Sequence, residues 1–169
     1  MTQTLHRNAP PPRRLQRWPL LLLLLAVCCA VAAVGGLTSS DAANIYRSLD
    51  RPAWAPPSWL FGPVWTVLYA TIAISAWVVL RGRVLAESRV QIGAWSAQLA
   101  FNLAWTPLFF GAGQYGLAFL DICVLLAAIG TTMALFWRSS AYATLLLVPY
   151  ALWVLYAASL NLAIWQLNG

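Results

Sequence analysis

The chain contains five long apolar stretches separated by short polar connections. Each is long enough to cross a bilayer as a helix, which takes about 20 apolar residues. None shows the alternation of apolar and polar positions that marks membrane strands, and residues 20–25 are all leucine. The pattern therefore predicts an all-α membrane protein whose residues 18–169 form one bundle of five transmembrane helices. The expected helices are residues 18–37, 59–80, 90–110, 116–137 and 141–167.

The segment ahead of these stretches, residues 1–17, is polar, rich in proline and basic, which predicts a disordered tail. The first stretch also fits a cleaved signal peptide, since arginines precede its leucine-rich core and Ala30-Val31-Ala32 resembles a cleavage site. The apolar run continues beyond that site to Leu37, long enough to stop in the bilayer. This favours a retained helix.

Composition supports the membrane assignment, because 62% of the residues are apolar, 8% are charged and the mean hydropathy is +0.73. Soluble domains carry about 25% charged residues, so a soluble globule is excluded. The chain also has no clustered basic surface for nucleic acid. Its three cysteines lie in apolar runs and are expected to be buried, and its single histidine, His6, lies in the tail. We therefore expect neither a metal site nor an obligatory cofactor.

The arginines are distributed unevenly between the two sides of the predicted bundle. Eight of the ten lie in the tail, the second-to-third connection or the fourth-to-fifth connection, and only Arg47 and Arg51 lie on the opposite side. Positive charge favours the cytoplasmic side of a membrane. We expect a cytoplasmic N-terminus, and the inner membrane of a bacterium as the default location.

The longest connection, residues 38–58, contains Tyr46 and the segment Arg51-Pro52-Ala53-Trp54-Ala55-Pro56-Pro57. Proline restricts its own backbone and that of the preceding residue, so this loop should be stiff. Its tryptophans fit two interpretations, an anchor at the headgroup level or a lid over a cavity.

Three predicted helices each present an aromatic face. The third carries Gln98, Asn102, Trp105 and Phe109 at helical spacing, the second carries Trp65 and Tyr69, and the fifth carries Tyr150, Trp153 and Asn161 after a kink expected at Pro149. Taken singly, the two asparagines could simply join helices through hydrogen bonds. Taken with the tryptophans, they favour a pocket for a large, flat, mostly apolar ligand.

The third helix also carries a strip of small residues, Gly93, Ala97, Ala100 and Ala104. Ala97 and Asn102 lie about 140° apart around a helix, so the strip faces away from the aromatic side. Such strips allow close helix approach, either inside one bundle or between two copies in a homodimer.

Asp121 is the only acid well inside a predicted span. Acids in membrane helices are often functional, but this one lies near the start of its helix, where solvent or the helix dipole stabilises a carboxylate. Both interpretations stay open.

Four ordered segments resemble the TspO/MBR family, the bacterial tryptophan-rich sensory proteins and the mitochondrial translocator protein, or peripheral benzodiazepine receptor. They are Tyr46 with residues 51–57, residues 61–69 (Phe-Gly-Pro-Val-Trp-Thr-Val-Leu-Tyr), residues 98–110 (Gln-Leu-Ala-Phe-Asn-Leu-Ala-Trp-Thr-Pro-Leu-Phe-Phe), and residues 149–153 (Pro-Tyr-Ala-Leu-Trp) with Leu160-Asn161.

The resemblance implies a dimeric five-helix receptor whose pocket is covered by the first loop and binds a porphyrin such as protoporphyrin IX. It implies that Trp65 and Trp153 face each other in this pocket, joined by Asn102, Tyr46 and Pro56. With the aromatic faces above, the candidate ligand-binding residues are Tyr46, Trp54, Pro56, Trp65, Tyr69, Asn102, Trp105, Trp153 and Asn161. The sterol motif proposed for the family is incomplete, because no basic residue follows Tyr156.

These residues support three functions to different degrees. A porphyrin-binding sensor fits the aromatic faces and the arginines of the first loop. An enzyme has less support, because the predicted bundle contains no catalytic triad or paired carboxylates, which leaves light-driven oxidation of a bound porphyrin. An ion-coupled transporter of tetrapyrroles or membrane lipids ranks last, because such carriers usually show internal repeats and several intramembrane charges.

Overall fold

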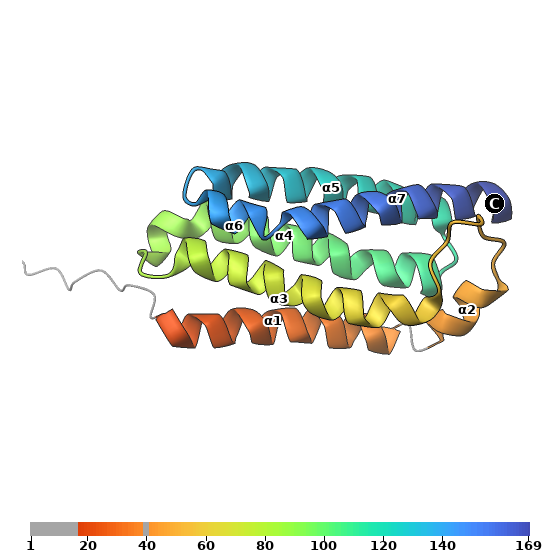
Figure 1. Cartoon of the computed structure of the whole chain (residues 1–169), viewed down its shortest axis with the longest axis horizontal. Coiled ribbons are helices and arrows are strands. Elements are labelled where there is room, and N and C mark those ends of the chain that lie inside the picture. The colour runs from red at the N-terminus through yellow and green to blue at the C-terminus, as the bar shows by residue number, and fades with distance from the viewer. Residues whose placement is uncertain (1–16, 39–40) are drawn as a thin grey trace, which may run out of the picture.

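The computed structural model describes residues 17–38 and 41–169, which form an elongated bundle of helices (Figure 1). The predicted tail, apart from Arg17, lies outside the described residues. Five long helices run along the bundle: α1 (Arg17–Thr38), α3 (Phe61–Leu80), α4 (Arg89–Thr106), α5 (Tyr115–Trp137) and α7 (Val148–Asn168). No strand occurs in the part of the chain described. The predicted all-α bundle of five helices is confirmed.

Four spans are long and apolar enough to cross a membrane: Arg17–Thr38, Ser58–Leu80, Tyr115–Trp137 and Ala141–Asn168. The remaining long helix, α4, is more polar because it carries Gln91, Gln98 and Asn102. Gln98 and Asn102 are buried inside the bundle. A polar face is tolerated at this position because other helices cover it.

The shorter elements lie in the connections. Helix α2 (Ala42–Ser48) follows α1, and the 3₁₀ turns η1 (Ser58–Leu60) and η2 (Leu85–Ser88) precede α3 and α4. After α4, the widened turn η3 (Pro107–Gly111) contains a bond from the Ala112 N–H to the Pro107 carbonyl. Proline has no N–H, so it cannot continue the regular ladder of α4. The predicted third helix therefore ends in a wider turn.

The last predicted helix is divided into α6 (Ala141–Leu145) and α7. Pro149 cannot donate a hydrogen bond to the carbonyl of Leu145, and the chain leaves the helix at residues 146–147. The ladder resumes with the bond from the Ala151 N–H to the Leu147 carbonyl. The interruption expected at Pro149 thus lies immediately before it.

Apolar side chains from all five long helices form the core, among them Leu24, Ile72, Leu99, Ile129 and Val154. Helix α1 is less firmly packed than the others, because its buried residues are confined to Leu20, Leu24 and Cys28. The expectation of three buried cysteines is wrong, since Cys29 and Cys123 are exposed. Both project from helices that a bilayer would surround, where a thiol behaves as a small apolar group.

The strip of small residues lies on the outside of the bundle. Gly93, Ala97 and Ala100 are exposed and Ala104 is half-buried. The strip therefore does not pack inside its own bundle and remains available to another molecule.

Candidate ligand pocket

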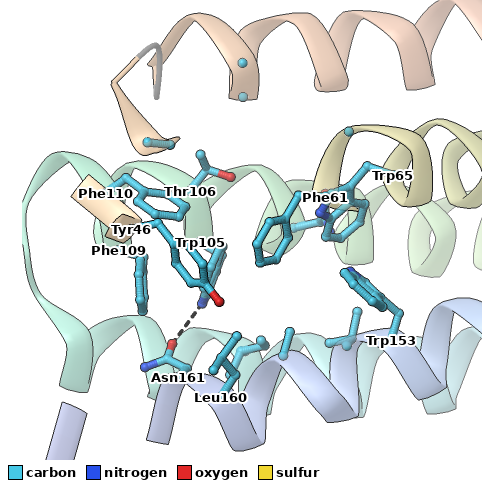
Figure 2. A pocket seen from close by; sticks show the side chains of 18 of the residues that line it. Tyr46, Phe61, Trp65, Trp105, Thr106, Phe109, Phe110, Trp153, Leu160 and Asn161 are labelled. Atoms are coloured by element: carbon cyan, nitrogen blue, oxygen red, sulfur yellow. Dashed lines mark hydrogen bonds between the residues drawn. The ribbon is translucent and has the colours of Figure 1, made fainter. Parts of the chain in front are cut away.

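A cavity of about 480 Å³ lies in the half of the bundle that contains α2. Helices α1, α2, α3, α4, α5 and α7 and the turn η3 all contribute to its wall (Figure 2). The aromatic lining consists of Tyr46, Phe61, Trp65, Tyr69, Trp105, Phe109, Phe110 and Trp153. Such a wall, with few polar groups, is typical of a site for an apolar aromatic ligand.

Trp65 of α3 and Trp153 of α7 project toward each other from opposite sides of the cavity (Figure 2). Phe61 lies beside them and packs against Trp153, with 6.0 Å between ring centroids. Within residues 17–38 and 41–169, neither indole N–H of the facing pair has a hydrogen-bond partner. The pair thus offers two flat surfaces and two free donors.

Asn102 is buried in α4 and accepts a hydrogen bond of 2.6 Å from the Tyr69 hydroxyl at its Oδ1. This bond joins α3 to α4 and orients the amide. Asn102 also lines the cavity, and its Nδ2 makes no hydrogen bond within the described residues, although the Tyr150 hydroxyl lies close to this amide. The side chain therefore joins two helices and also offers a donor to a ligand.

Asn161 of α7 forms hydrogen bonds through both the oxygen and the nitrogen of its amide. Its Oδ1 accepts a bond of 3.0 Å from the Trp105 indole, and its Nδ2 donates to the Tyr115 carbonyl at 2.9 Å. These contacts connect α7 to α4 and α5 while Asn161 still lines the cavity. The bond from the indole to Asn161 also fixes the position of the Trp105 ring, which stacks on Phe109 with 4.8 Å between ring centroids.

Tyr46 of α2 closes the cavity from the loop side. Its ring packs edge-on against Phe61 at 5.3 Å, and its hydroxyl donates a bond of 2.9 Å to the Pro56 carbonyl. Burial raises the pKa of the Tyr46 phenol, although the Arg51 guanidinium, 4.6 Å from the ring centroid, acts in the opposite direction. The hydroxyl is therefore a neutral donor at physiological pH.

Two candidate residues, Trp54 and Pro56, lie outside the cavity lining. Pro56 is buried and contributes the carbonyl that Tyr46 binds. Trp54 is half exposed, and its carbonyl accepts a bond of 3.0 Å from the Tyr156 hydroxyl of α7. Both residues therefore act on the cavity indirectly, by fixing the loop. The other seven candidates all contribute to the lining.

The cavity also contains residues that were not among the candidates. Phe61, Phe109, Phe110 and Leu160 line it, as do Gly35 and Gly36 of α1. The phenylalanines could have been included from helical spacing, since Phe61 and Phe109 each lie four residues from a candidate tryptophan. Helical spacing gave no reason to include the two glycines among the candidates.

Asp121 of α5 is half-buried and does not line the cavity. Its Oδ2 is buried without a hydrogen-bond partner in the described part of the chain. The structure thus separates this carboxylate from the pocket.

The fold and the cavity together define a polytopic all-α membrane protein with an aromatic cavity between its helices. Within this class, the sequence profile of the TspO/MBR family matches residues 23–166, and the chain belongs to that family.

The relatives include both bacterial and mammalian proteins. The "Translocator protein" of Ovis aries is 40% identical over 126 residues, which cover 73% of this chain and 74% of that protein. The "Tryptophan-rich protein TspO" of Chlorobaculum tepidum is 41% identical over 133 residues, covering 78% and 84%. The human "Translocator protein" is 36% identical over 125 residues, covering 73% and 74%.

Proposed function

We propose that this protein is a membrane receptor that binds a porphyrin, such as protoporphyrin IX, in the aromatic cavity. The observation that carries the proposal is the facing pair Trp65 and Trp153, set in a cavity of about 480 Å³. Ligand pockets measure about 300–1,000 Å³, and stacking of aromatic rings contributes about 0.5–1.5 kcal/mol beyond surface burial. A flat macrocycle makes the fullest use of such walls.

Polar groups at the two ends of the cavity fit the same ligand. Asn102 and the two indoles offer N–H donors inside the bundle. At the loop, Arg51 lies over the ring of Tyr46, and the exposed Arg47 belongs to the same helix as Tyr46. Carboxylates on one edge of a macrocycle would find these guanidinium groups in reach of charge-assisted hydrogen bonds.

A titration of the purified protein with protoporphyrin IX, followed by porphyrin fluorescence, tests the proposal. Replacing both Trp65 and Trp153 with phenylalanine should weaken binding about tenfold, because stacking area and two donors are lost. Trp137→Phe is the matched control, since Trp137 is exposed at the end of α5, away from the cavity. Equal affinities of the double variant and the unaltered chain would refute the assignment.

Light-driven oxidation of the bound porphyrin, with dissolved dioxygen as the oxidant, is a second candidate function. The observation that favours it is the placement of two electron-rich indoles on opposite sides of the same cavity. Illumination of the complex should then bleach the porphyrin faster than illumination of the Trp65→Phe, Trp153→Phe complex. Equal bleaching rates would leave binding as the function.

We further propose that the N-terminus lies in the cytoplasm and that the protein resides in a bacterial inner membrane. Of the seven arginines in the described residues, five lie at the end of the bundle where α1 begins and two lie at the other end, which supports this orientation. A reporter enzyme fused after Gly169 should be active only outside the cytoplasm. Cytoplasmic activity would reverse the orientation.

A further inference from the structure

The end of the bundle opposite the cavity carries a strong excess of positive charge. Figure 1 shows that α1 begins at the same end as the α3–α4 and α5–α6 connections. The described residues at this end include five arginines and one carboxylate, that of Glu87; the arginines are Arg17, Arg81, Arg83, Arg89 and Arg138. Since α1 and α3 are membrane-spanning helices that begin or end here, these charges lie at the edge of the bilayer.

Two of these arginines belong to an ordered cluster that joins α1 to α3. The Trp77 indole of α3 donates a bond of 2.6 Å to the Arg17 carbonyl. Trp18 stacks on Trp77, with ring centroids 6.1 Å apart and an interplanar angle of 30°. The Arg81 guanidinium lies 4.6 Å from the centroid of the Trp77 ring. We call these four residues the Arg17–Arg81 cluster.

Stacking on Trp77 restricts the Arg81 side chain but leaves its hydrogen-bonding edge free. A cation above an indole is held by the charge distribution of the ring, whereas the guanidinium N–H groups point outward in its plane. In the described part of the chain, neither Arg81 nor Arg17 has a carboxylate partner. The cluster therefore presents one oriented guanidinium, that of Arg81, without an acceptor, while Arg17 holds the Trp77 ring through its backbone carbonyl.

We propose that the Arg17–Arg81 cluster binds the phosphate of an anionic phospholipid headgroup. Arginine forms paired hydrogen bonds with phosphate oxygens, and basic sites between membrane helices bind anionic headgroups. Trp18, 70% exposed, lies where tryptophan contacts the boundary between headgroup and acyl chain. A zwitterionic choline lipid would bring its own cation toward the same arginines, so the site discriminates against it. The cluster lies far from the cavity, so this proposal is independent of porphyrin binding.

Arg138 provides a matched control within the same chain. It is exposed at the same end of the bundle, but its guanidinium stacks on no ring in the described residues. General attraction between a basic surface and an anionic bilayer would depend on both arginines alike. An oriented site would depend mainly on Arg81.

The experiment titrates the full chain in detergent with short-chain phosphatidylglycerol or phosphatidylcholine and counts bound lipid by native mass spectrometry. The unaltered chain should prefer phosphatidylglycerol, and Arg81→Gln should reduce that preference about fivefold. The preference of Arg81→Lys for phosphatidylglycerol should fall between those of the unaltered chain and Arg81→Gln, because lysine keeps the charge but lacks the planar pair of donors. The lipid preference of Arg138→Gln should stay close to that of the unaltered chain.

Three results would overturn the proposal. Equal losses in Arg81→Gln and Arg138→Gln would show general electrostatic attraction, and equal binding of both lipids would show that the site does not discriminate. Displacement of phosphatidylglycerol by inorganic phosphate would assign the cluster to a free anion from solution. Circular dichroism of each variant verifies that the helices are intact.

Discussion

The two asparagines of the cavity illustrate how one residue type takes different roles. Asn161 uses both the oxygen and the nitrogen of its amide in hydrogen bonds to Trp105 and Tyr115, so its side chain serves to join helices. Asn102 accepts the bond from Tyr69 at its oxygen, and its amide lines the cavity beside the Tyr150 hydroxyl. Tyr69 is thus a positioning residue, because it determines which end of the Asn102 amide a ligand meets.

Replacing Tyr69 with phenylalanine should release this amide. We expect a loss of about 1 kcal/mol in the free energy of unfolding, the usual contribution of one hydrogen bond. Porphyrin binding should also weaken, because the donor of Asn102 is no longer oriented. Thermal unfolding in detergent and the porphyrin titration measure the two effects. Tyr142→Phe, at an exposed position whose hydroxyl has no bond in the described structure, should change neither.

At the scale of elements, sequence patterns were sufficient for the long helices. Length and uninterrupted apolar character predict a membrane helix without knowledge of its neighbours, and the regions expected for α1, α3 and α5 agree closely with the structure. Helix α2, with only seven residues, was not anticipated. Short helices depend on tertiary contacts such as the burial of Tyr46, which local sequence does not reveal.

The candidate site was predictable to the extent that helical spacing determined it. Residues on one face of a helix, such as Asn102 and Trp105, can be grouped from sequence alone. The roles of Trp54 and Pro56 could not be obtained in this way, because both contribute backbone carbonyls and the Trp54 ring packs against Tyr156, a residue distant in the sequence. Every residue type offers a backbone carbonyl, so side-chain identity gives no signal for these two hydrogen bonds.

Residues 49–59, which we call the strap, are connected to α7 at two points. The Tyr156 hydroxyl binds the Trp54 carbonyl, and the Asn168 amide pairs with the backbone of Asp50, donating at 2.9 Å and accepting at 3.0 Å. Two exposed strap tryptophans, Trp54 and Trp59, also suit contact with headgroups. The strap therefore has the exposed tryptophans of an anchor, and through the Pro56 carbonyl it holds Tyr46, which lines the cavity as the lid considered from sequence would.

Loss of these connections should allow the ligand to leave faster. In the double variant Tyr156→Phe, Asn168→Ala, we expect porphyrin dissociation to accelerate about tenfold, because bonds worth about 0.5–1.5 kcal/mol each no longer hold the strap. Stopped-flow displacement of bound porphyrin gives the rate. Ser159→Ala is the control, since that hydroxyl bonds only to the Leu155 carbonyl of its own helix. An unchanged rate in the double variant would show that the strap does not limit release.

For the whole molecule, the exposed strip on α4 predicts a symmetric homodimer. Close backbone approach along Gly93, Ala97 and Ala100 allows extensive dispersion contacts, and the same strip on two copies gives a self-complementary interface. This prediction concerns assembly and is separate from the pocket, because Gln98 and Asn102 point into the bundle.

Ala97→Leu should separate the two copies and shift the protein toward the monomer while porphyrin affinity is retained. Size-exclusion chromatography with light scattering in mild detergent reports the mass. Ala30→Leu, at an exposed position of α1 outside the strip, should leave the oligomeric state unchanged. An Ala97→Leu variant that stays dimeric would exclude this face as the interface.

The attachment of the strap to α7 has a consequence for biosynthesis. The paired residues are separated by 102 positions for Trp54 and Tyr156 and by 118 for Asp50 and Asn168. A ribosome therefore completes the strap long before it makes the helix that holds it. Contacts between such distant segments form late, because the intervening chain must first be ordered. The wall of the cavity therefore cannot be completed until α7 has been made, because α7 contributes Trp153 and Asn161 to it and also holds the strap.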